Sequence, residues 1–84
     1  MTLHLLFSSR ADVHQRMLDS FTDGDAIVLL EQGLLAQRSQ QLHYLARRDD
    51  GQQQGLLSLP LTWLNDAEWL TLTLTATRTL SWFD

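Results

Sequence analysis

Residues 3–30 read LHLLFSSRADVHQRMLDSFTDGDAIVLL, and this stretch decides the fold. Its apolar runs, Leu3–Phe7 and Ala26–Leu30, have the length of buried strands and are too short for free-standing helices. From Ala11 to Phe21 apolar residues recur every three or four positions, which predicts an amphipathic helix, and the serine pair before it offers an N-cap. Two strands joined by a helix through short turns form a βαβ unit. We therefore expect parallel strands and an α/β fold.

The rest of the chain supplies further short elements. Residues 34–41 predict about two turns of helix, Leu42–Ala46 a third strand, and the polar stretch 47–54 a flexible loop. Residues 59–64, which contain a proline, predict a short fourth strand. Asn65 and Glu68 match a capping box and predict a helix from Asp66, whereas the alternation of leucine and threonine that follows favours a strand. We expect one domain over residues 1–84, a small three-layer α/β fold whose mostly parallel sheet of four to five short strands is flanked by helices.

Length and charge exclude several classes of function. With 84 residues and no cysteine, the chain has a small core and no covalent crosslink, so we expect it to be stabilised by partner subunits. Ten acidic residues against six arginines give a net charge of −4, which argues against direct nucleic-acid binding. The apolar runs are too short for a membrane span. No basic stretch precedes the first of them, so we expect no export signal and a cytoplasmic location.

No pattern predicts a catalytic, cofactor-binding or metal site. Persulfide transfer needs a thiolate, and the chain has none. Ser9 and His14 could be recruited for hydrolysis, but no nucleophile elbow surrounds them, and the three histidines have no metal-site spacing. Tryptophans near a chain end often contact a partner subunit, because tryptophan is enriched at interface hot spots. Histidines on strands are also found at subunit contacts. The candidate interface residues are His4, His43, Trp69 and Trp82.

Three segments taken together resemble the TusB/DsrH family: Leu3–Ser9, Gly24–Gly33 and Leu80–Trp82. The similarity is one of order and spacing, and it extends along nearly the whole chain. It implies a helix from Asp66 to about Thr75 and a final short strand around Thr79–Trp82. The chain departs from the family at Gln32-Gly33, where an aspartate usually precedes the glycine, and in its abbreviated second helix.

The resemblance implies a non-catalytic subunit of a sulfur-relay heterohexamer, paired with two homologous subunits that are TusC-like and TusD-like. In such a complex a cysteine of the TusD-like subunit passes persulfide sulfur to a downstream carrier, and the sulfur reaches 2-thiouridine at the tRNA wobble position. Some DsrH relatives in sulfur oxidation carry a cysteine on the first helix, near the place of Met17 here. This chain lacks that chemistry.

Two other classes of function stay open. One is an acidic protein-interaction module of unrelated function, for which the missing cysteine and the tryptophan-rich end are equally expected. The other is a small hydrolase or transferase that uses Ser9 and His14 and would be active as a lone chain. Within the resemblance, tRNA thiolation and sulfur oxidation are both open as the parent pathway.

Overall fold

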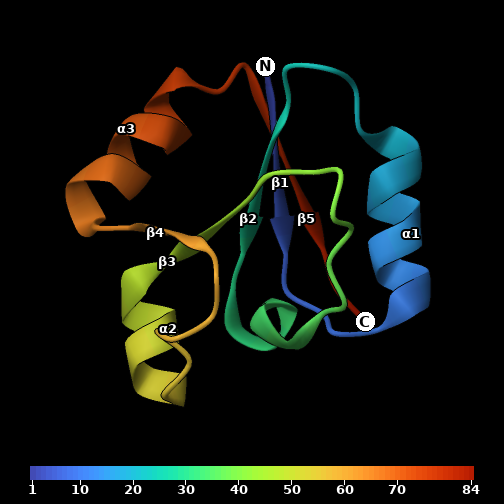
Figure 1. Ribbon diagram of the computed structural model, residues 1–84. Coiled ribbons are helices and arrows are strands. Elements are labelled where there is room, and N and C mark those ends of the chain that lie inside the picture. Colours follow the sequence, from blue (N-terminus) through green and yellow to red (C-terminus); the bar gives the residue numbers. More distant parts are fainter.

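The computed structural model describes residues 1–84 as a five-stranded sheet with helices on both faces (Figure 1). The sheet order is β4-β3-β2-β1-β5, and every neighbouring pair is parallel. The predicted small α/β fold is confirmed, and its sheet is entirely parallel. In chain order the elements are β1 (Thr2–Leu6), α1 (Ala11–Ser20), β2 (Ala26–Leu29), the 3-10 helix η1 (Glu31–Leu35), β3 (Tyr44–Arg47), α2 (Arg48–Gln54), β4 (Thr62–Leu64), α3 (Asp66–Thr75) and β5 (Arg78–Trp82).

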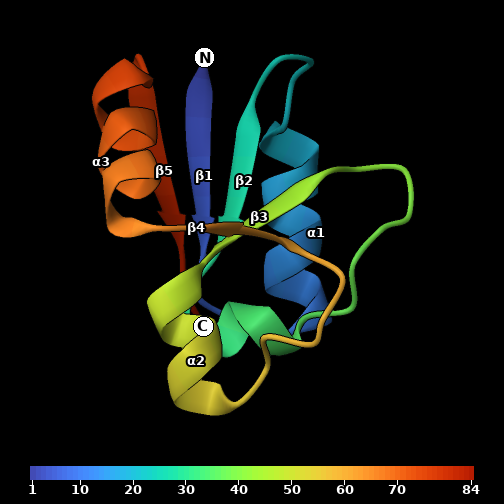
Figure 2. The ribbon, with the colours of Figure 1, turned by 60° about the vertical axis from the view of Figure 1, so that its left-hand side comes forward.

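Alternation along the strands gives the sheet two faces with different cores. The face under α1, here the α1 face, carries the larger core: Leu6, Val13, Met17, Ile27, Leu29, Leu34, Ala36, Tyr44 and Ala46. The face under α3, here the α3 face, has a buried cluster of only Leu3, Val28 and Leu30. Figure 2 shows α1 and α3 on opposite sides of the strands. No helix has both the length and the apolar character that a membrane span requires.

The βαβ unit forms as predicted, but its serines do not cap the helix. Leu3–Leu6 pair in parallel with Ala26–Leu29, and Val13 and Met17 of α1 are fully buried. The N-cap position is Arg10, which makes no side-chain cap bond. The hydroxyl of Ser8 is turned inward instead, where it accepts from the Arg10 backbone N–H and donates to the Asp84 carboxylate. The N-cap prediction was therefore wrong, because Ser8 is fully buried and holds the two ends of the chain together.

Two predictions in the middle of the chain were also wrong. The helix expected at 34–41 is absent, and the 3-10 helix η1 begins earlier, directly after β2. It can do so because Gly33 lies against the backbone of Leu6, where a Cβ would overlap the Leu6 carbonyl oxygen. The loop expected at 47–54 is instead helix α2, which ends at Gly55 in the left-handed conformation. A glycine, Gly51, lets this helix approach the ring of Trp63 closely.

The C-terminal third resolves the conflict between the helix and strand patterns. Asn65 caps α3 with the predicted capping box, and the helix runs through the leucine–threonine alternation. The threonines are accommodated because the Thr73 and Thr75 hydroxyls bond back to carbonyls three and four residues earlier. The final strand β5 covers the predicted strand around Thr79–Trp82. The fourth strand is shorter than predicted, since only Thr62–Leu64 pair with β3.

Candidate functional site

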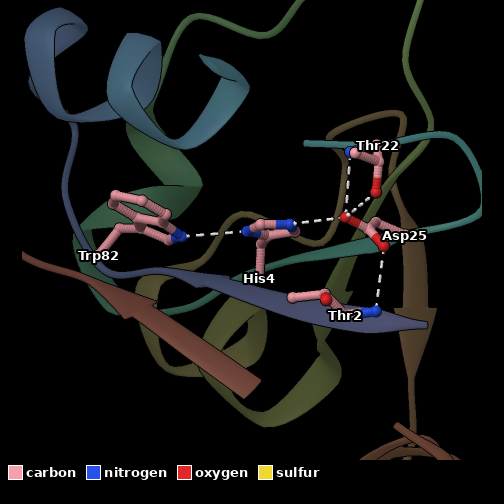
Figure 3. A network of polar contacts seen from close by, with 5 residues as sticks. All are labelled: Thr2, His4, Thr22, Asp25 and Trp82. Carbon is pink, nitrogen blue, oxygen red and sulfur yellow. Dashed lines mark hydrogen bonds and ion pairs between the residues drawn. The ribbon is translucent and has the colours of Figure 1, made fainter. Parts of the chain in front are cut away.

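Hydrogen bonds join three side chains from β5, β1 and the turn before β2, namely Trp82, His4 and Asp25 (Figure 3). The Trp82 indole N–H donates to His4 Nδ1 at 3.2 Å. On the other side of the ring, His4 Nε2 lies 3.0 Å from Asp25 Oδ2. His4 is fully buried, so none of its atoms reaches the surface. These hydrogen-bonded side chains therefore link the edge strand β5 to the centre of the sheet, and they do not expose a catalytic imidazole.

The hydrogen-bond donors around these side chains indicate which ring nitrogen of His4 accepts and which donates. An indole N–H can only donate, so His4 Nδ1 must accept and His4 Nε2 carries the proton that is given to Asp25. Asp25 also accepts from the backbone N–H groups of Thr2 and Thr22 and from the Thr22 hydroxyl. The Thr2 and Thr22 amides, with a further contribution from His4, hold the pKa of Asp25 far below its usual value. The network is fully satisfied and has a structural role.

The pair considered for hydrolysis, Ser9 and His14, has no catalytic geometry. Both line a surface hollow of about 440 Å³ beside α1. His14 Nε2, however, lies 2.9 Å from the Tyr44 hydroxyl, which in turn accepts from the Ser39 backbone N–H. Burial lowers the pKa of His14, and no hydrogen bond joins it to Ser9. His14 and Tyr44 instead tie α1 and β3 to the segment that follows η1.

The four candidate interface residues are not brought together. His4 is internal, and Trp82 is half-buried on the α1 face with its indole N–H already used by His4. His43 is exposed just before β3 and bonds to Thr62 at 3.2 Å. Trp69 is half-buried on the α3 face, where the Arg47 guanidinium stands 5.6 Å from its ring centroid. Contact with a partner stays a prediction for His43, Trp69 and Trp82, whereas His4 has no surface for it.

The surface that stands out is the α3 side of the sheet. No residue of α3 is buried, in contrast to α1, and Leu70 and Leu74 are 58% and 77% exposed. Beyond the helix, Phe83 is 57% exposed and stacks on Phe7, with ring centroids 4.5 Å apart. Trp69 and Phe7 line one hollow of about 310 Å³ at the carboxyl ends of the central strands. We call this group of apolar residues the α3 patch: Phe7, Trp69, Leu70, Leu74 and Phe83.

The helix that carries the patch lacks the charge of a solvated face. Residues 69–77 contain no ionisable side chain, although most of them are exposed. Leu70 and Leu74 are one turn apart and project away from the sheet, while Trp69 and Leu72 pack against it. A helix with apolar residues on both sides is typical of one that is covered on both sides. The α3 patch is therefore the candidate functional site.

Sequence reasoning missed several of these roles. No hydrogen-bonding role was predicted for Asp25, whose carboxylate accepts from the backbone N–H of Thr22 three residues earlier. Tyr44 had no assigned role. The uncharged run after Glu68 was visible in the sequence, but only the helical assignment shows that it places Leu70 and Leu74 together on the solvent side. No group of three or more histidine, aspartate or glutamate side chains is arranged to hold a metal ion.

No protein-family model, no curated protein and no solved structure matches this chain.

Proposed function

We propose that this chain is a non-catalytic subunit of a cytoplasmic sulfur-relay complex, in which TusC-like and TusD-like subunits are its partners and the product pathway is 2-thiouridine formation at the tRNA wobble position. The single observation that carries the proposal is the α3 patch. The three most exposed large apolar side chains, Leu70, Leu74 and Phe83, all belong to this patch, as expected for a subunit that is completed by its neighbours.

The chemistry of the chain is consistent with this role. There is no cysteine to carry sulfur, two of the three imidazoles are buried and bonded within the fold, and the buried hydroxyl of Ser8 is engaged with Asp84. The five-stranded parallel sheet is the kind of fold that the TusB/DsrH resemblance implies. The resemblance supplies the pathway, and the patch supplies the physical reason for assembly.

The experiment is co-expression of a tagged copy of this chain with the TusC-like and TusD-like subunits, followed by native mass spectrometry of the purified material. We expect one species that contains all three chains in equal numbers. Recovery of the tagged chain alone, folded and free of both subunits, would contradict the proposal.

One alternative shares the same observation. An unrelated acidic interaction module would also expose the α3 patch and lack cysteine. Such a module would bind a different partner. The same co-expression experiment therefore separates the module from a relay subunit, because a module would not co-purify with either relay subunit. A DsrH-like role in sulfur oxidation keeps the assembly and differs in the downstream carrier that accepts the sulfur.

A further inference from the structure

The α3 patch has an acidic rim at the end where α3 begins. The first turns of α2 and α3 hold two acidic residues each, and Glu31 is the first residue of η1. Only two arginines, Arg47 and Arg48, accompany them. The carboxylates of the rim are Glu31, Asp49, Asp50, Asp66 and Glu68. Most of the net charge of −4 is thus gathered beside the patch.

Arg47 offsets only part of the negative charge of this rim, because five carboxylates stand against two arginines. Its guanidinium is 3.7 Å from carboxylate oxygens of both Asp49 and Asp66 and stands over the Trp69 ring. It is therefore already engaged within the chain. Glu31, Asp50 and Arg47 line the same hollow as Phe7 and Trp69, so two carboxylates and one guanidinium border the apolar surface directly and leave it a net negative edge.

We infer that the α3 patch docks a different protein, whose contact surface is apolar and is bordered by arginine or lysine side chains. The inference rests on the proposed function for the identity of that partner, a TusC-like or TusD-like subunit, and on the charge distribution for its chemistry. Complementary charges around an apolar contact favour the correct partner and speed its encounter.

The α3 patch of a second copy of this chain does not provide the matching surface. The arginine nearest the far end of α3 is Arg78, the first residue of β5. By strand alternation Arg78 shares a face with Leu80 and Trp82, and Trp82 packs on the α1 face. Pairing two copies through their patches would therefore leave each acidic rim without a basic counterpart.

The test uses two matched pairs of variants in the co-expressed complex. Leu74→Glu changes the most exposed residue of the patch, and its control is Leu35→Glu, at a leucine that is 55% exposed beside α1. Asp66→Asn removes one rim charge at an exposed site, and its control is Asp19→Asn, at an exposed residue on α1. Neither leucine belongs to the core, so the lone variants are expected to remain folded.

We expect Leu74→Glu to weaken binding of the partner subunit about tenfold or more, whereas Leu35→Glu binds normally. Asp66→Asn should weaken binding by a smaller factor than Leu74→Glu and reduce its dependence on salt, with no such change for Asp19→Asn. Equal binding by Leu74→Glu and Leu35→Glu, in a complex that assembles normally, would overturn the docking site and leave the proposed function standing.

Two further outcomes count against the inference in different ways. If the unaltered chain recruits neither relay subunit, the proposed function fails and the partner named here fails with it. Sedimentation of the lone chain tests whether a second copy of the chain occupies the patch instead. A dimer that is abolished by Leu74→Glu and kept by Leu35→Glu would assign the patch to a second copy and overturn the choice of a different protein.

Discussion

Replacing Trp82 by phenylalanine is the sharpest test of the hydrogen bonds that join Trp82, His4 and Asp25. The substitution keeps an aromatic ring on the α1 face and removes the indole N–H that His4 Nδ1 accepts. Because His4 is fully buried, no water replaces the lost donor. Leaving a buried acceptor unsatisfied costs about 1–3 kcal/mol. A single core of this size supplies only about 3–5 kcal/mol, so the loss is a large part of the stability of the chain.

The assay is thermal and urea unfolding of the lone chain followed by circular dichroism. A loss of about 2 kcal/mol corresponds to a fall of about 8–16 °C in the unfolding midpoint for a domain of this length. The matched control is Trp69→Phe, because the Trp69 side chain is also half-buried and its indole N–H makes no hydrogen bond within the chain. This control should shift the midpoint much less.

A double-mutant cycle isolates the hydrogen bond from the packing of the ring. In the His4→Leu background there is no buried acceptor that the loss of the indole N–H could leave unpaired. Adding Trp82→Phe should therefore lower the free energy of unfolding by little more. Asp25 keeps its Thr2 and Thr22 donors in that background. Equal effects of Trp82→Phe and Trp69→Phe, or an undiminished cost of Trp82→Phe beside His4→Leu, would refute the reasoning.

Three further predictions concern packing, pH and sulfur. Gly33→Ala should destabilise the chain by about 2 kcal/mol or more in urea unfolding, because the added Cβ overlaps the Leu6 carbonyl oxygen; an unchanged midpoint would contradict the close approach. Burial lowers the pKa of His14, so stability should be complete above about pH 6.5, where the unfolded histidine is neutral, and should fall as the pH drops through the folded pKa. Thermal midpoints of the chain and of His14→Phe between pH 7 and pH 5 check this, and equal slopes would count against it. After incubation of the complex with a cysteine desulfurase and cysteine, mass spectrometry should find added sulfur on a partner subunit and none on this chain, which has no thiol.

The parts of the fold that the sequence predicts well are those with strong local patterns. The βαβ unit of residues 3–30 combines two apolar runs with a helical period, and both strands and α1 form where expected. The capping box at Asn65 likewise outweighs the alternation that follows it, because two side-chain bonds hold the helix start while the threonine hydroxyls bond back to the helix.

The errors lie where tertiary contacts decide. Residues 48–54 carry charges, glutamines and a glycine and have no apolar period, yet they form α2 because Gly51 lets the helix sit against Trp63. Residues 34–41 have helix-forming composition, but the chain turns immediately after β2, where Gly33 meets Leu6. In both places a glycine is needed for close packing with a residue far away in sequence.

The candidate site could be predicted only in part. Trp69 was predicted to contact a partner, and it lies in the α3 patch; the contact itself stays a prediction. Leu70 and Leu74 were not, since their exposure depends on helix α3 lying across a sheet face that it does not fully cover. His4 was assigned to an interface because it lies on a strand, and only the structure shows that Asp25 and Trp82 meet its two ring nitrogens.

We propose that this chain serves a sulfur relay through assembly and not through chemistry of its own. The most direct measurement is the rate at which radiolabelled sulfur passes from a cysteine desulfurase to the downstream carrier through the TusC-like and TusD-like subunits, with and without this chain. The account predicts that transfer is strongly reduced when the chain is omitted and is restored by the unaltered chain, with all label in the partner and the carrier. An equal rate in its absence, or label bound to this chain, would contradict it.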